Sequence, residues 1–304
     1  MGKFLRQPKL WITLASLIFI AVALAQQAGQ LRQLSLVANG WWWLVLGLGL
    51  TWLSILINGL AWRDLLIWLR HPPQGVAVVP LFVRSNLLKY LPGGIWHLVE
   101  RVRVLRLAIG GGPALAGVIL DPLLIVAASV LVVVAGGWQQ GLALLAPWPA
   151  LLMMSRWREP LLRRLERSKA AQLQSVGSGP LASEGSGRGG YPWRPLSLQL
   201  LFVVCRFAGF WCSVQAFGIQ SPAPFTWLAA SGLAYAVGLV VPGAPGGLGV
   251  FEATLLLRLG AAVPEAQLLA VVLSYRLLST LADVVASGAL VADRMLGQRL
   301  KRHR

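Results

Sequence analysis

YAVGLVVPGAPGGLGVFE, residues Tyr235 to Glu252, is the stretch of sequence that decides the fold. It places two prolines and five glycines among side chains apolar enough for the interior of a bilayer, and it ends on a carboxylate. Proline and glycine interrupt helices, and hydrocarbon offers no water to the backbone groups that are freed. Irregular backbone at membrane depth therefore survives only inside protein or beside a water-filled cavity. The stretch predicts a broken helix that lines a polar cavity.

The composition of the whole chain is that of a membrane protein. Of its 304 residues, 57% are hydrophobic and only 12% are charged, against about 25% charged in a soluble domain. Apolar runs near the 20-residue length of a spanning helix recur at 10–25, 41–62, 113–154, 196–219, 225–241 and 266–292. The run at 113–154 has room for two spans with a turn at 136–141. We predict an all-α polytopic membrane protein.

The net charge of +17 would indicate a nucleic-acid partner if the basic residues covered a folded surface. They lie instead in short segments beside the apolar runs, as cytoplasmic loops do, so we expect no nucleic-acid partner. Basic residues before the first run, at 155–170 and at 294–304 predict a multi-pass protein of the plasma (inner) membrane with both termini cytoplasmic. The first run also resembles a secretory signal. Whether this run is cleaved or kept as a helix, the segment that follows it begins outside the cytoplasm.

With these orientations, each of two segments must end on the side of the membrane on which it began. Residues 76–107, the first hairpin, begin and end inside, and residues 225–260, the second hairpin, begin and end outside; each contains Pro-Gly-Gly. The two halves then match as span, broken re-entrant hairpin and span in opposite orientations, an inverted-topology repeat of the kind found in transporters.

The predicted fold has two inverted-topology halves, about six full spans and two broken re-entrant hairpins. Its divisions are an N-terminal half at 1–169, a flexible cytoplasmic linker at 170–195, rich in glycine, serine and proline, and a C-terminal half at 196–304.

Charged residues inside the apolar segments are the candidate functional residues. Each would cost about 2.5 to 3.5 kcal/mol at a helix centre if it faced lipid, so each must pair or face water. They are Arg84, Lys89, Asp121, Arg206, Glu252, Arg276 and Asp283. Several readings stay open: Arg276 and Asp283 share a helix face and could form a structural ion pair, and Asp121 could simply accompany the kink at Pro122. Arg206 could pair with an acid, and Arg84 and Lys89 could reach the headgroups.

The glycine breaks offer a second kind of binding group. A helix that restarts after Gly93 and Gly94, or after Gly246 and Gly247, presents free N–H groups and the positive end of its dipole, which suits a phosphate. The chain has three histidines and two cysteines, Cys205 and Cys212, without zinc spacing, and we expect the cysteines to be packing residues.

Three segments resemble a known family: LKYLPGGIWHLVERVRVL (88–105), PGGLGVFEATLLL (245–257) and LSYRLLSTLADVV (273–285). They are similar to the membrane region of lysylphosphatidylglycerol synthases and their stand-alone, flippase-like relatives, and the resemblance covers about 41–292. It implies functional roles for Arg101, Glu252 and Arg276. Trp96 and His97 stand where many members have glycines, so the resemblance leaves the lipid open. The chain shows no counterpart of the aminoacyl-transferring domain, and we do not expect it to lysinylate lipids alone.

We predict a flippase or transporter, not an enzyme, that binds or translocates an anionic phospholipid or lipid-linked headgroup through a central polar cavity. The expected substrate-binding residues are Gly93, Gly94, Arg101, Asp121, Arg206, Gly246, Gly247, Glu252, Arg276 and Asp283. We expect no cofactor and no metal; without a nucleotide-binding loop, transport would be passive or gradient-driven. One alternative is a membrane-embedded enzyme acting on a lipid phosphate, in which Asp121 and Glu252 could hold magnesium. Another is a non-transporting partner of a glycosyltransferase or lipid-synthesising enzyme.

Overall fold

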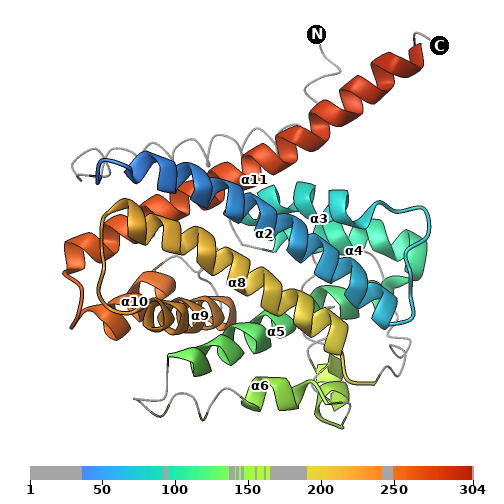
Figure 1. The fold of residues 1–304 in the computed structure, drawn as a ribbon. Helices are drawn as coiled ribbons and strands as arrows, with labels where there is room; N and C mark the ends of the chain where they lie inside the picture. Colours follow the sequence, from blue (N-terminus) through green and yellow to red (C-terminus); the bar gives the residue numbers. More distant parts are fainter. Residues whose placement is uncertain are drawn as a thin grey trace.

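The computed structural model describes residues 36–91, 95–136, 141, 144, 147–154, 156–160, 162–164, 190–241 and 249–302, the last nine as backbone only. Every regular element within these residues is a helix (Figure 1). Four are long and apolar enough to cross a membrane: α2 (Gly40–Trp68), α5 (Gly111–Leu131) with its 3₁₀ extension η3 (Val132–Ala135), α8 (Trp193–Ala216) and α11 (Glu265–Arg302). They coincide with four of the predicted runs.

Two other predicted spans cannot be compared with the structure in the same way. The run at 10–25 lies outside the described residues, as do 165–189, most of the predicted linker. The second part of the run at 113–154 is described only in pieces, among them the short helix α6 (Pro147–Leu152). The predicted number of six spans therefore stays a prediction.

Each predicted hairpin consists of two helices that pack against each other. The first contains α3 (Val78–Asn86), the 3₁₀ turn η2 (Leu87–Tyr90) and α4 (Trp96–Ile109), and the second contains α9 (Pro224–Val240) and α10 (Val250–Leu259). The breaks at 92–94 and 242–248 lie outside the described residues. Gly249 directly before α10 has φ +81°, a conformation that glycine adopts without steric cost, so the sequence places its last break glycine where the backbone requires one.

The two halves repeat one order of helices: a long helix, a two-helix hairpin and a second long helix. The contacts repeat as well. If α2, α3, α4 and α5 are exchanged for α8, α9, α10 and α11, the set of packed helix pairs among these eight helices stays the same. α2 and α8 pack together along the middle of the molecule, and each hairpin contacts the last long helix of the other half, α3 on α11 and α9 on α5 (Figure 1). The halves are thus interlocked.

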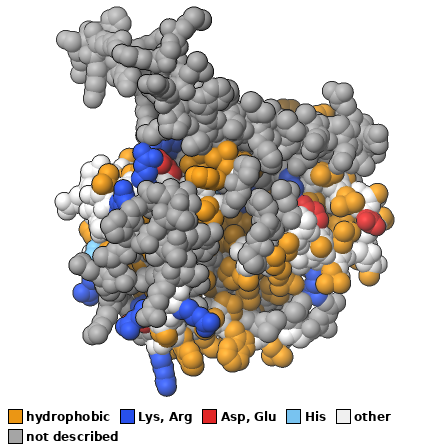
Figure 2. All heavy atoms as spheres, turned by 180° about the vertical axis from the view of Figure 1, so that it is seen from behind, with side chains coloured by type: hydrophobic (Ala, Val, Ile, Leu, Met, Phe, Trp, Pro, Cys, Tyr) orange, Lys and Arg blue, Asp and Glu red, His pale blue; other side chains and the backbone are white. Residues whose placement is uncertain are grey.

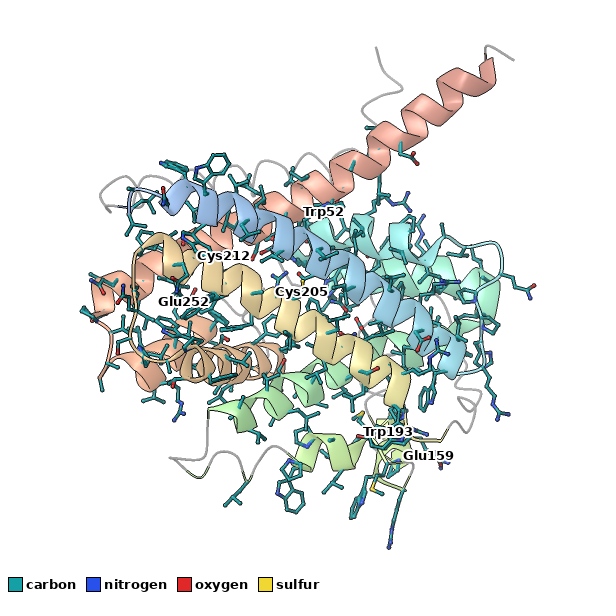
Figure 3. All side chains as sticks on the ribbon, in the orientation of Figure 1. Trp52, Glu159, Trp193, Cys205, Cys212 and Glu252 are labelled. Atoms are coloured by element: carbon teal, nitrogen blue, oxygen red, sulfur yellow. The ribbon has the colours of Figure 1, made fainter. Side chains whose placement is uncertain are left out.

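Small residues let α2 and α8 approach closely. A Cβ atom at Gly47 would lie 3.0 Å from the Cβ of Cys212 and 3.1 Å from the carbonyl oxygen of Gly209. Cys205 donates from Sγ to the carbonyl of Leu50 at 3.4 Å, and both cysteines are buried and unoxidised on α8 (Figure 3). Lipid tails are as apolar as leucine, so helices in a membrane associate through such close packing. The cysteines are packing residues, as predicted.

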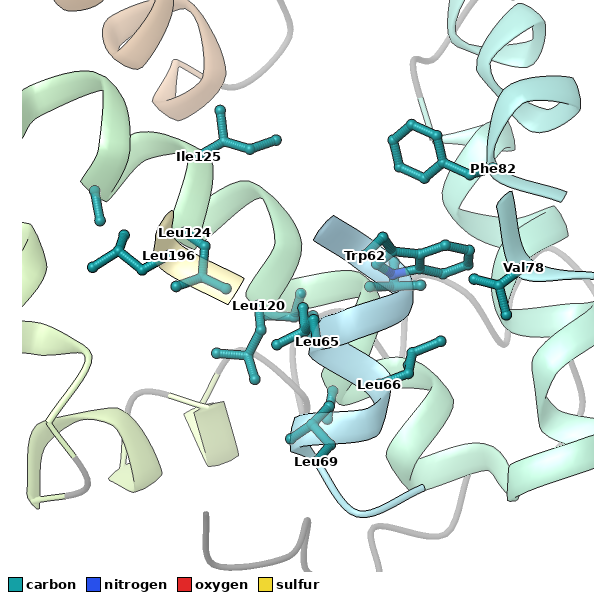
Figure 4. Close-up of a cluster of buried hydrophobic side chains, with 14 of the residues drawn as sticks. Trp62, Leu65, Leu66, Leu69, Val78, Phe82, Leu120, Leu124, Ile125 and Leu196 are labelled. Carbon is teal, nitrogen blue, oxygen red and sulfur yellow. The ribbon is translucent and has the colours of Figure 1, made fainter. Parts of the chain in front are cut away.

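Trp62 anchors the largest apolar cluster, which joins α2, α3 and α5 (Figure 4). The side chain is fully buried, its ring centre lies 5.7 Å from that of Phe82, and its Nε1 donates to the carbonyl of Gly117 at 3.2 Å. The indole N–H therefore has the partner that a buried tryptophan needs. This cluster holds the first hairpin against the spans.

Apolar side chains also cover much of the outside. Leu46, Leu53, Leu60 and Ile67 are exposed at intervals of seven along α2, so they form one face of that helix. Hydrophobic side chains gather in the centre of the face in Figure 2, with Lys and Arg mostly toward its left and lower edges. Such a surface suits a lipid environment, where it contacts acyl chains.

Candidate functional site: a buried network of ion pairs

Arg101 on α4 is the centre of a buried polar network. Its side chain is almost fully buried; Nε donates to Ser85 Oγ at 3.0 Å and Nη2 donates to Asn86 Oδ1 at 2.8 Å. Nη1 lies 3.6 Å from Asp121 Oδ2, and the guanidinium carbon lies 3.8 Å from the ring centre of Phe82. The first hairpin thus turns Arg101 inward, and the carboxylate of α5 balances its charge.

Asp121 extends the network to two more spans. Its Oδ1 accepts a hydrogen bond from Gln199 Nε2 at 2.7 Å, and the same nitrogen donates to Asn58 Oδ1 at 3.1 Å. Gln199 lies on α8 and Asn58 on α2, so α2, α4, α5 and α8 are joined through polar side chains. Pro122 stands inside α5, which continues past it as one helix.

Asp283 on α11 carries the network into the second half. Its buried carboxylate lies 2.5 Å from Lys89 Nζ and accepts hydrogen bonds from Tyr90 Oη at 2.8 Å and from Asn86 Nδ2 at 3.4 Å. Asn86 therefore bridges Asp283 and Arg101. We call the connected set the polar network: Asn58, Ser85, Asn86, Lys89, Tyr90, Arg101, Asp121, Gln199 and Asp283.

Glu252 and Arg276 form a separate ion pair between α10 and α11. Glu252 Oε1 is in direct contact with Arg276 Nε, and its Oε2 accepts a hydrogen bond from the backbone N–H of Gly249 at 2.8 Å. The Glu252 carboxylate therefore caps the N-terminus of α10 and binds Arg276 of α11 at the same time. Figure 3 labels Glu252 at the left of the molecule, near α10.

The structure shows which partners some of these charged residues have. Arg276 and Asp283 pair with Glu252 and Lys89 on other elements, rather than with each other. Arg84 is exposed, whereas Lys89 points to the interior. Sequence spacing alone gave no means of choosing these partners.

Arg206 on α8 behaves differently from the other interior cations. No carboxylate among the described residues lies within ion-pair distance of it, and its buried Nε has no hydrogen-bond partner there. Its guanidinium carbon lies 5.9 Å from the ring centre of Tyr235 and 5.7 Å from that of Tyr275. The suggested pairing of Arg206 with an acid is not found in the part of the chain that the structure describes.

Some predicted site residues cannot be placed. Gly93, Gly94, Gly246 and Gly247 lie outside the described residues. Asp121 and Glu252, the pair considered for magnesium, belong to different ion pairs. Among the described residues there is no group of three or more His, Cys, Asp or Glu side chains able to hold a metal ion.

Sequence reasoning missed the uncharged members of the polar network. Asn58 and Gln199 stand in apolar spans, and a buried amide requires partners as a charge does. A search for all polar residues in the apolar runs, rather than for charged ones alone, would have found both. Ser85 and Tyr90 carry no comparable indication, because both types are common in ordinary helices.

Apolar helices of spanning length around a shared polar interior define an α-helical, multi-pass membrane protein. The chain belongs to the family described as the lysylphosphatidylglycerol synthase TM region, whose model matches residues 10–287. The predicted resemblance is confirmed, and it extends further toward the N-terminus than the three segments indicated. A comparison with curated proteins gave no match.

Proposed function

We propose that this protein is a lipid flippase, which binds the headgroup of an anionic phospholipid or lipid-linked molecule and passes it between the two halves of the bundle. The polar network is the observation that carries the proposal. Arg101, Asp121 and Asp283 are each at most 3% exposed, and burying charges in a medium without water costs several kcal/mol per ion. Apolar side chains of similar volume would stabilise the core at least as well, so the presence of these three charged residues favours a functional role.

The ion pairs provide a mechanism for accepting an anion. The phosphodiester of a phospholipid carries one negative charge, as a carboxylate does, and it makes the same two-pronged contact with arginine. A headgroup that enters the bundle would replace Asp121 at Arg101, or Glu252 at Arg276, and the displaced carboxylate would bind it again when the lipid leaves. The cations are thus neutralised throughout, which keeps the free-energy barrier to movement low.

The exchangeable contacts of the two halves support an inverted repeat. In this proposal the first hairpin enters from the cytoplasm, the second enters from the opposite side, and both termini are cytoplasmic in the plasma membrane. Rocking of one half against the other would then expose the polar network to each side in turn. A lipid-synthesising enzyme or glycosyltransferase that supplies the lipid is the expected partner.

The test is a scrambling assay with the full chain in vesicles that contain a fluorescent phosphatidylglycerol. Dithionite bleaches only the outer leaflet, so a working flippase increases the bleached fraction beyond about half. We expect Arg276→Gln to slow scrambling at least tenfold, since it removes the cation of the second ion pair. Arg84→Gln is the matched control, because this hairpin arginine is exposed and should leave the rate unchanged.

Two outcomes would contradict the proposal. One is a wild-type rate equal to that of empty vesicles. The other is an Arg276→Gln protein that folds, by its thermal unfolding in detergent, and scrambles normally. Mass spectrometry of the recovered lipids separates transport from catalysis: a flippase returns the lipid unchanged, with or without EDTA, whereas an enzyme acting on the phosphate returns a product.

A further inference from the structure

A small cleft separate from the polar network lies where α8, α9, α10 and α11 meet. Its volume is about 20 Å³, room for about one water molecule. Its lining is almost entirely aromatic or small apart from one cation, and consists of Val203, Arg206, Phe207, Phe210, Ser231, Gly232, Tyr235, Phe251 and Tyr275. Three of the four helices belong to the second hairpin and the span that follows it.

The cation in this cleft lacks the carboxylate partner that three other cations of the bundle interior have. Lys89, Arg101 and Arg276 each lie in an ion pair with a carboxylate. Among the described acids, Asp283 interacts electrostatically with Arg206, but it is already bound at 2.5 Å by Lys89. The middle of α8 therefore carries a positive charge that no described carboxylate balances directly.

The aromatic walls compensate this charge only in part. The rings of Tyr235 and Tyr275 lie within 6 Å of the guanidinium carbon, the range in which ring faces attract cations. The Nε of Arg206 is nevertheless buried without a hydrogen-bond acceptor among the described residues. A buried charged donor without an acceptor is costly, so the site is suited to an anion that brings its own oxygen.

We propose that this cleft binds the phosphate of an anionic phospholipid, with Arg206 as the counter-ion and the tyrosine hydroxyls as further donors. The inference rests on the proposed function, and it names the position in the second half at which the headgroup is held. Arginine is well suited to a phosphate because its planar fork offers two parallel hydrogen bonds. Since the cleft has room for about one water, a phosphate oxygen enters it and the rest of the lipid stays outside.

Equilibrium binding of fluorescent phosphatidylglycerol to the full chain in detergent micelles tests the proposal. Arg206→Gln should weaken binding at least tenfold, and Tyr235→Phe about threefold. The matched control is Arg258→Gln. Arg258 on α10 also has a buried Nε without a partner among the described residues, but it does not line the cleft, so its loss should leave binding unchanged.

Competition identifies the source of the phosphate. Unlabelled phosphatidylglycerol should displace the probe, whereas phosphatidylcholine and inorganic phosphate at the same concentration should do so at least tenfold less well. Equal displacement by inorganic phosphate would overturn the assignment to a lipid. Equal displacement by phosphatidylcholine would overturn the requirement for an anionic lipid.

Thermal unfolding separates binding from a purely structural role. Without lipid, Arg206→Gln should melt at or above the wild-type temperature, because it removes an unbalanced buried charge; with phosphatidylglycerol, only the wild type should gain stability. An Arg206→Gln protein that binds the lipid as well as the wild type overturns this inference and leaves the proposed flippase intact. A wild type that binds the lipid but does not scramble it overturns the proposed flippase and leaves this inference intact.

Discussion

Removing the charge of Asp283 tests the energetic basis of the polar network. Asp283→Asn keeps the shape of the side chain and one of its two oxygens, so it can accept from Tyr90 or from Asn86 but not from both, and it leaves Lys89 without its carboxylate. Breaking a buried pair from one side costs about 3 to 5 kcal/mol. The lower end applies here because the Lys89 side chain is 26% exposed, so we expect a loss of about 3 kcal/mol.

Two further variants divide this energy into its parts. Asp283→Ala also removes the hydrogen bond that the asparagine oxygen retains, at about 0.6 kcal/mol inside a membrane protein, for a total of about 4 kcal/mol. Asp283→Asn combined with Lys89→Met removes both charges, so the double variant should be more stable than the sum of the single changes by about 2 kcal/mol. Such a coupling energy is the mark of a direct interaction.

The assay is reversible unfolding of the purified protein in mixed detergent micelles, followed by tryptophan fluorescence. A loss below about 0.5 kcal/mol in Asp283→Asn would refute the reasoning, since it would mean that the unpaired Lys89 reaches solvent at little cost. Additive effects in the double variant would refute it as well, because they would show that the two charges do not depend on each other. Arg84→Gln should change the unfolding free energy by less than about 0.5 kcal/mol, as exposed substitutions do.

Two other predictions concern packing. Gly47→Leu should destabilise the protein by about 2 to 3 kcal/mol, because a Cβ atom at this position would lie 3.0 Å from the Cβ of Cys212. Gly49→Leu is the control and should change thermal unfolding little, because a Cβ atom there would have no neighbour within 4 Å. Equal effects at both positions would contradict close packing of α2 on α8. Trp62→Phe should cost about 1 kcal/mol through the lost hydrogen bond to Gly117, and Trp62→Ala about 3 to 5 kcal/mol through the cavity it leaves. Similar losses for both tryptophan variants, measured by the same melting experiment, would show that packing around the ring contributes little.

The spanning helices could be predicted closely because their cause is local. A helix in hydrocarbon satisfies its own backbone and needs only an uninterrupted apolar run. The run at 266–292 predicted the spanning part Glu265–Asp293, and the run at 41–62 fell within Gly40–Trp68. The two-helix hairpins could be predicted as well, because each contains a Pro-Gly-Gly cluster, whereas the single Pro122 leaves α5 continuous.

The charged residues were predicted in kind but not in pairing. A carboxylate such as Asp121 in an apolar run must find a partner, whatever the fold, and the sequence established that requirement. Arg276 and Asp283 show the limit of this reasoning: they lie seven residues apart on one helix, yet their partners Glu252 and Lys89 come from different hairpins. Helical spacing fixes which residues share a face and contains no information on what that face meets.

By itself the sequence determined an all-helical membrane protein with two interrupted hairpins and a set of charges that lipid cannot solvate, because each of these follows from the free energy of one segment in hydrocarbon. The tertiary structure alone decided that Asn86 joins Arg101 to Asp283, that Gln199 and Asn58 complete the network, and that Arg206 stands apart in an aromatic cleft. These outcomes depend on which helices pack together, and packing is a property of two surfaces at once.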